Sequence, residues 1–146
     1  MIYLGADHRG YELKEKLKQW LGELGYEHED CGAFEYDKND DYPDFAVAVA
    51  KKVTANPDSK GILICGSGIG VAITANKIKG VRACTATSVE QVKASVNDED
   101  LNVLAISADY INEEQVREIT KTFLDTKFSE EERHIRRVNK IKELEK

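Results

Sequence analysis

The sequence predicts an α/β fold, with a three-layer, Rossmann-like arrangement around a five-stranded parallel sheet. Short apolar segments fit for buried strands alternate along the chain with segments of helical periodicity. Such alternation is typical of parallel sheets joined by right-handed crossovers. The 146 residues, 41% of them hydrophobic and 33% charged, suffice for one core, so we expect a single domain over residues 1–146.

Five strands and six helices are expected, each from its own local pattern. Leucines at helical spacing between Leu13 and Leu24 mark the first helix. Ser88 and Asn112 are placed to cap the fourth and fifth helices. The strands are expected at residues 1–6, 26–30, 61–64, 81–86 and 102–107, and the helices at 10–24, 44–54, 71–77, 88–97, 112–126 and 130–144.

The last helix carries one narrow apolar stripe, in residues 135–144, among many charges. Two interpretations stay open, because such a helix packs either on a partner subunit or on its own domain. Arg133 and Arg137 lie one turn apart and face the same way. Two guanidinium groups on one face suit a phosphate group, although a solvated basic face has the same pattern.

The stretch from Gly61 to Gly70 combines a buried strand, a glycine-rich loop and the start of a helix. Backbone N–H groups in such a loop, together with the helix N-terminus, favour an anion. The spacing of Gly66, Gly68 and Gly70 is neither the dinucleotide fingerprint nor a P-loop. Cys65 stands at the mouth of this loop, where a thiol can act as a thiolate; a buried core thiol is the alternative interpretation.

Other polar residues follow the remaining strands, and ligands bind at the carboxyl ends of the strands in such sheets. Asp7 and His8 follow the first strand, Thr87-Ser88 the fourth and Ala108-Asp109 the fifth. Asp7 is either a functional carboxylate or a cap of the first helix. The remaining histidines, His28 and His134, are interpreted as surface residues, and Cys31 and Cys84 as packing residues.

Composition also argues against several classes of protein. A net charge of −6 without a long basic run disfavours nucleic acid as a partner, and no apolar segment is long enough for a membrane span. We see no signal peptide at the N-terminus. Three widely spaced cysteines and scattered histidines indicate neither a metal site nor a disulfide framework, so a reducing cytoplasm is the expected location.

Several motifs occur in an order and spacing that covers nearly the whole chain and together resembles one family. They are Gly5-Ala6-Asp7-His8-Arg9-Gly10, Asp41-Tyr42-Pro43, residues 61–70, Ala75-Asn76-Lys77, Gly80-Val81-Arg82-Ala83, Asn102-Val103-Leu104-Ala105, and Arg133-His134 with Arg137. The chain is identified by them as similar to the ribose-5-phosphate isomerase B family, which also includes the galactose-6-phosphate isomerase subunits.

The resemblance implies an aldose–ketose isomerase of carbohydrate metabolism, in the pentose phosphate pathway, with no metal or organic cofactor. It implies a homodimer or tetramer whose active site is shared between two subunits, with a sugar phosphate as the small-molecule substrate. Cys65 is then the base that removes a proton beside the carbonyl, and Ser67 and the loop N–H groups hold the enediolate. The residues implied to bind substrate are Asp7, His8, Tyr42, Gly66, Gly68, Gly70, Asn76, Arg133 and Arg137, with His8 and the two arginines at the phosphate end.

Two positions depart from the family pattern. The ring-opening histidine of the family falls on Asp98, which is therefore the third catalytic candidate, and a phosphate-binding arginine falls on Asp109. A carboxylate at Asp109 repels phosphate unless Arg9 or Arg136 compensates. These changes leave two alternatives beside ribose 5-phosphate isomerisation: an isomerase of another sugar or hexose phosphate, and a non-catalytic sugar-phosphate-binding homologue.

Overall fold

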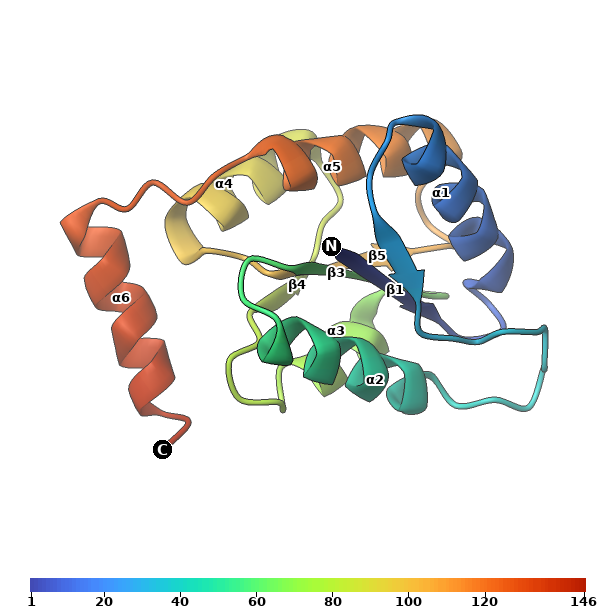
Figure 1. Ribbon diagram of the computed structural model, residues 1–146, viewed down its shortest axis with the longest axis horizontal. Helices are drawn as coiled ribbons and strands as arrows, with labels where there is room; N and C mark the ends of the chain where they lie inside the picture. The colour runs from blue at the N-terminus through green and yellow to red at the C-terminus, as the bar shows by residue number, and fades with distance from the viewer.

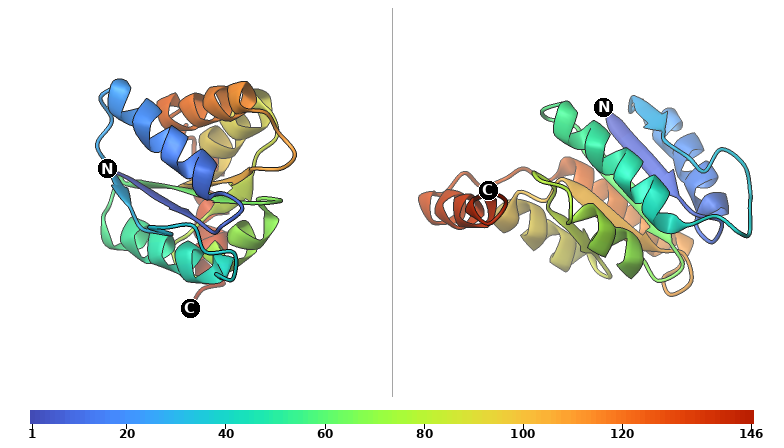
Figure 2. Two further views of the ribbon diagram at one scale, coloured as in Figure 1. Left: turned by 90° about the vertical axis from the view of Figure 1, so that its right-hand side faces the viewer. Right: turned by 90° about the horizontal axis from the view of Figure 1, so that it is seen from below.

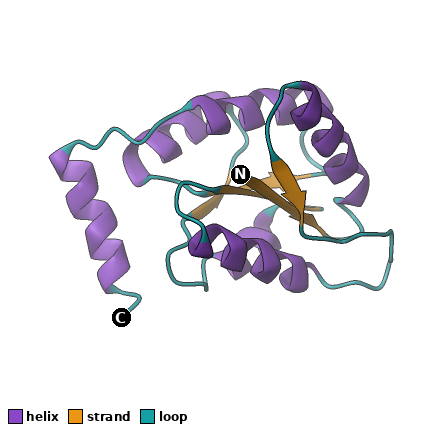
Figure 3. Ribbon diagram, in the orientation of Figure 1, coloured by secondary structure: helices purple, strands orange, loops and turns teal.

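The computed structural model describes all residues 1–146 as a five-stranded, entirely parallel sheet between two layers of helices (Figures 1 and 3). The sheet order is β2-β1-β3-β5-β4. The predicted three-layer α/β fold is therefore confirmed. Its strands are β1 (Ile2–Ala6), β2 (His28–Asp30), β3 (Lys60–Cys65), β4 (Ala83–Thr85) and β5 (Val103–Ser107).

Three helices cover one face of the sheet and two cover the other (Figure 2). The first layer holds α1 (Tyr11–Glu23), α4 (Val89–Glu99) and α5 (Glu113–Asp125); the second holds α2 (Tyr42–Ala55) and α3 (Ile69–Ala75). Because successive strand residues point to opposite faces, Leu4 packs in the first layer and Tyr3 in the second. Cys65 belongs to the second layer, on the side of α2 and α3.

The predicted caps form as expected. The Ser88 side chain accepts from Gln91 N, and Asn112 forms a capping box with Gln115. Several boundaries differ from the prediction, and two of them lie at the site. Helix α3 begins at Ile69 rather than Val71, because Gly68 is its left-handed N-cap, and α2 begins at Tyr42 with Pro43 in its first turn.

Helix α6 (Glu132–Glu143) stands apart from the three layers and is joined to them by the segment after α5 (Figure 1). It touches its own domain through His134 and Val138, which are buried. The interpretation of His134 as a surface residue was wrong: its Nδ1 lies 2.6 Å from Ser129 Oγ. No helix of the protein has both the length and the apolar character that a membrane crossing requires.

The connections of the sheet reverse direction between β1 and β3, which are neighbours. The chain leaves β1 through α1 toward β2 at one edge, and leaves β3 through α3 toward β4 at the other. The carboxyl ends of β1 and β3 therefore flank a crevice, and the register pairs Ala6 with Ile64 there. Ligands of open α/β sheets bind at such a switch point.

Candidate active site

The glycine-rich loop leaves β3 directly after Cys65 and turns sharply into α3. Gly68 has a φ of 75°, a conformation that side chains rarely adopt. A Cβ at Gly68 would lie 2.8 Å from the Ile106 carbonyl carbon and from Ser107 N, which are backbone atoms. Glycine is required at this position both by backbone conformation and by the close approach of β5.

Neighbouring strands hold this loop in place. Ser107 Oγ donates to Gly66 O at 2.7 Å, and Thr85 Oγ1 donates to Gly68 O, also at 2.7 Å. The carbonyl groups of Gly66 and Gly68 accept these two hydrogen bonds. The N–H groups of Gly66, Ser67 and Gly68, by contrast, have no acceptor in the protein. Fixed N–H donors without a partner can stabilise a negative charge that develops on an oxygen atom.

Ser67 adds a hydroxyl group to these donors. Its Oγ accepts from Ile69 N at 3.1 Å, and the residue is exposed. Because that bond uses a lone pair of the oxygen, the hydroxyl proton is left to donate outward. Ser67 and the loop N–H groups therefore form one set of donors.

The thiol of Cys65 lies at the base of this loop, at the end of β3, and only 5% of the residue is exposed. The other two thiols have different surroundings. Burial, reinforced by the charge of Glu29, raises the pKa of Cys31 to about 11, and burial also raises the pKa of Cys84. Both are protonated at neutral pH, which agrees with their interpretation as packing residues.

The turn after β1 lies against this loop. An added Cβ at Gly10 would lie 2.6 Å from Ile64 O, and one at Gly66 would lie 2.6 Å from Arg9 Cζ. In this turn, Asp7 Oδ1 accepts from Arg9 N at 3.0 Å and from Gly10 N at 3.1 Å. Asp7 thus stabilises the turn before the first helix but does not cap that helix, whose N-cap is Gly10 without a side-chain hydrogen bond.

His8 is paired with Asp40, a contact that the sequence analysis missed. Asp40 Oδ1 lies 2.7 Å from His8 Nδ1 and accepts from His8 N at 2.9 Å. With Asp7, these residues bring three groups of the metal-ligand type within 4.8 Å of one another. If a divalent cation bound here, it would compete with the existing hydrogen bond between His8 and Asp40.

Two further contacts close the site around the glycine loop. The Tyr42 ring packs on Gly70, where an added Cβ would lie 2.6 Å from the ring. Arg9 passes over Gly66 and forms an ion pair with Asp109. The carboxylate that was expected to repel phosphate is therefore neutralised, by one of the two arginines considered for that role.

Four predicted site residues lie elsewhere in the subunit. Asn76 follows α3 at its far end, and its amide is used in two 2.8 Å bonds to the Ala83 backbone. Asp98 is the second-last residue of α4, at the amino edge of the sheet, with one oxygen 3.7 Å from His134 Nε2. Arg133 and Arg137 lie on α6, at the same far end (Figures 1 and 2). A single chain does not bring these four together with Cys65.

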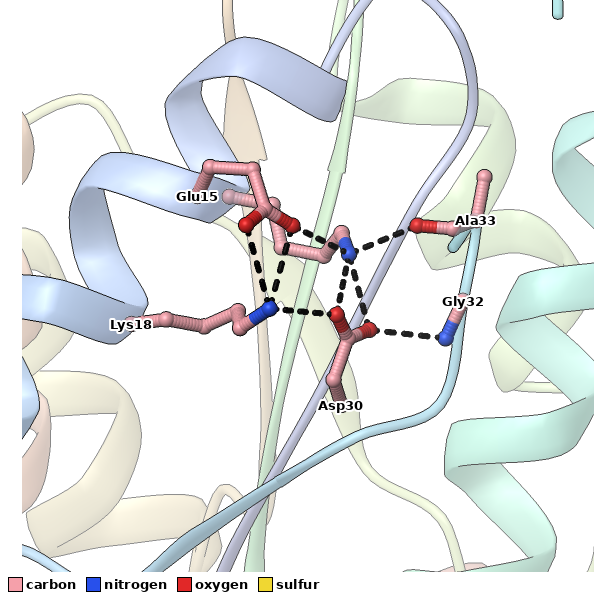
Figure 4. Close-up of polar contacts among 6 residues, drawn as sticks. Glu15, Lys18, Asp30, Gly32 and Ala33 are labelled. Carbon is pink, nitrogen blue, oxygen red and sulfur yellow. Dashed lines mark hydrogen bonds and ion pairs between the residues drawn. The ribbon is translucent and has the colours of Figure 1, made fainter. Parts of the chain in front are cut away.

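A network of charged groups joins the first helix to the segment that follows β2, and Figure 4 shows Glu15, Lys18 and Asp30 within it. Lys14 is fully buried in α1, and its Nζ donates to both oxygens of Asp30 at 2.7 and 2.8 Å and to Ala33 O at 2.7 Å. Asp30 also accepts from Lys18 and from Gly32 N. Burial alone would raise the pKa of Asp30, but these hydrogen bonds outweigh it and lower the pKa.

Fold and site together define a doubly wound α/β protein with a thiol and unpaired N–H donors at the switch point of its sheet. Comparison with known proteins gives the family: residues 2–141 match the model of the Ribose/Galactose Isomerase family. The ribose-5-phosphate isomerase B of Mycobacterium tuberculosis is 39% identical over 145 residues, which cover 99% of this chain and 90% of that protein. The chain therefore belongs to this family.

Solved structures agree with this assignment. The ribose-5-phosphate isomerase B of Mycoplasma genitalium, with bound ribulose-5-phosphate, superposes with a TM-score of 0.94 at 39% identity, covering 99% of this chain and 95% of that one. The enzyme of Clostridium thermocellum also gives a TM-score of 0.94, at 38% identity, with 99% and 96% covered. The resemblance found in the sequence motifs is confirmed.

Proposed function

We propose that this protein is an aldose–ketose isomerase that interconverts ribose 5-phosphate and ribulose 5-phosphate. The observation that carries the proposal is the position of the Cys65 thiol at the base of a loop with three unpaired N–H groups. Relatives at 39% identity over nearly the whole chain, named ribose-5-phosphate isomerase B, support the substrate. The enzyme would work in the cytoplasm, in the pentose phosphate pathway.

In the proposed mechanism, the Cys65 thiolate removes the proton from C2 of the open-chain aldose. The electron pair moves into a C1–C2 double bond, and negative charge develops on the former carbonyl oxygen. The N–H groups of the glycine loop and the Ser67 hydroxyl stabilise this enediolate. A proton moves from the C2 hydroxyl to the C1 oxygen, the Cys65 thiol returns its proton to C1, and the electron pair left on the C2 oxygen forms the C2=O bond of the ketose.

We also propose that each active site is formed by residues of two copies of the chain. Arg133 and Arg137 are exposed on α6, so their guanidinium groups are accessible to a substrate bound in a second copy of the chain. Asp98 lies close to α6, on α4, and would reach the same site as an acid or base. The apolar residues Ile135 and Ile141, partly exposed on α6, would pack on that copy in a homodimer or tetramer.

The direct test of this function is a coupled assay of the purified protein with a panel of substrates. The panel contains pentose phosphates, hexose phosphates and the corresponding free sugars. We expect ribose 5-phosphate to have the highest kcat/KM, and free ribose to be a poor substrate because it lacks the group that the arginines bind. A preference for a hexose phosphate would replace the proposed substrate, and no turnover of any sugar would favour a binding protein.

The shared site can be tested by subunit mixing. Cys65→Ala and Arg137→Ala are each expected to be nearly inactive, but a heterodimer of the two contains one intact site. Random mixing after unfolding and refolding should therefore restore about a quarter of the wild-type activity, as expected for a two-fold symmetric dimer. Refolding each variant alone is the control. If the mixture stays inactive, Cys65 and Arg137 do not act across an interface.

A further inference from the structure

The guanidinium group of Arg9 lies against the backbone of the glycine loop, next to Cys65. A Cβ atom added at Gly66 would lie 2.6 Å from Arg9 Cζ and 2.7 Å from its Nε. Atoms this near to the Cβ position are also in contact with the Gly66 main chain, at less than about 4.5 Å. Gly66 does not have a positive φ, so this contact, rather than the backbone conformation, opposes a side chain here. The loop and the arginine are therefore packed on each other.

The segment after β5 holds the same peptide through its backbone. Asp109 N donates to Gly66 O at 3.0 Å, and Ala108 N donates to Cys65 O at 2.9 Å. The side chain of Asp109 forms the ion pair with Arg9. Asp109 thus contacts the loop directly and also binds the guanidinium group that packs on it. The turn after β1, the glycine loop and the segment after β5 meet at this one point.

The ion pair is too exposed to be a main source of folding stability. The Arg9 side chain is 56% exposed and that of Asp109 is 32% exposed. Exposed pairs are screened by water and salt and contribute little to the free energy of unfolding. Catalysis places a stricter demand on the loop, because its N–H donors must be fixed where the enediolate oxygen will lie. A displacement of about 1 Å can lower a rate about 10²-fold, so this pair can matter for turnover while it matters little for folding.

We propose that Arg9 and Asp109 are positioning residues that form a clasp over the glycine loop and hold its N–H donors in place. The inference rests on the proposed function, since those donors act on the enediolate of the isomerase reaction. Neither residue needs to touch the sugar: Asp109 anchors the guanidinium group, and the guanidinium group limits movement of the Gly66 peptide. The clasp also gives a role to Asp109, at which this chain departs from the family pattern.

A clasp requires that the two residues act as a unit. Removing either one releases the Gly66 peptide from the arginine, so removing the second has no further effect. The loss falls on kcat and leaves KM nearly constant, because the loop donors act on charge that the bound ground state lacks. A residue that binds the substrate phosphate would instead raise KM, and residues with separate roles would give effects that multiply.

The experiment measures kcat and KM for ribose 5-phosphate with wild type, Arg9→Gln, Asp109→Asn and the double variant, at low ionic strength. Each single variant should lower kcat about tenfold and change KM by less than about twofold, and the double variant should match them. Lys16→Gln combined with Glu113→Gln is the matched control, and its kcat should equal that of wild type. That ion pair also joins α1 to α5, at 3.4 Å and with side chains 50% and 45% exposed, but neither residue bonds to the loop.

Urea denaturation and exchange of the C1 hydrogen of ribulose 5-phosphate with D₂O separate the alternatives. We expect the single variants to unfold at nearly the same urea concentration as wild type; a large loss of stability would make the pair a structural contact and overturn the inference. Unchanged kcat, a rise in KM alone, or a double variant much slower than either single variant would also overturn it. If wild type shows no exchange, the proposed function fails and the inference fails with it. Normal wild-type exchange with unchanged variants rejects only the clasp.

Discussion

Replacing Cys65 with serine is expected to lower kcat for ribose 5-phosphate by about 10³-fold, the range of a lost general base. The serine hydroxyl fills nearly the same volume but is far too weak an acid to supply an anionic base at neutral pH. Because the loop donors and the rest of the pocket are unchanged, KM should change little. Steady-state kinetics of the purified variant measures both parameters.

Stability provides the control for the Cys65 variant. Cys65 is buried, and a serine hydroxyl there without a hydrogen bond costs about 1–3 kcal/mol. The free energy of unfolding in urea should therefore fall by no more than this amount, so that the variant stays folded under assay conditions. Cys84→Ser, which alters a half-buried thiol outside the site, should keep full activity. Full activity in Cys65→Ser would instead remove the thiol from the mechanism.

Replacing Asp30 with alanine is expected to destabilise the protein by about 3–5 kcal/mol, the usual cost of removing one partner from a buried ion pair. The fully buried Lys14 ammonium would lose two of its hydrogen bonds and keep those to Ala33 O and Glu15. Urea denaturation at neutral pH measures the loss. Lys18→Ala is the control, because Lys18 is partly exposed on the same network and should cost about 0–1 kcal/mol.

The contribution of Asp30 should also depend on pH with a defined sign. The pKa of Asp30 is lowered in the folded protein, so the unfolded chain binds more protons in the acidic range. The stabilisation is fully present above the unfolded pKa, near 4, and is lost as the pH falls through the lowered folded value. The difference between wild type and Asp30→Ala should shrink below pH 4; a constant difference would show that the charge of Asp30 is not involved.

Local patterns were sufficient to predict the fold. Strand and helix order, the caps at Ser88 and Asn112 and the parallel sheet all follow from short-range periodicity. The glycine loop was predictable for the same reason, because Cys65, Ser67 and the glycines are contiguous in the chain. Their shared environment is fixed by one strand, one turn and one helix.

Pairs of polar residues far apart in the sequence could not be predicted. Asp40 lies 32 residues from His8, in a polar acidic loop whose composition gives no sign of a buried carboxylate. The ion pair between Arg9 and Asp109 depends likewise on two loops that only the sheet brings together. His134 was misjudged because the run of charges around it hides that one face of α6 meets α4.

Sequence motifs do not show which residues lie together in one subunit, as the positions of Asp98 and Asn76 illustrate. Asn76 occurs in a stretch that matches the family and Asp98 at a position that departs from it, yet each lies near the end of a helix that returns to the amino edge of the sheet. In a parallel α/β fold, only the residues after strands gather at the carboxyl edge. Topology alone therefore separates these residues from Cys65 within one subunit.

In the proposed mechanism, the Cys65 thiolate moves the proton between C2 and C1 of the sugar. The most direct measurement is the exchange of the C1 hydrogen of ribulose 5-phosphate in D₂O, followed by NMR with wild type and Cys65→Ser at equal concentration. We predict that wild type introduces deuterium at C1 and that the serine variant, still folded, loses this exchange by about 10³-fold, in line with its loss of a general base. Equal exchange rates in the two proteins would contradict the mechanism.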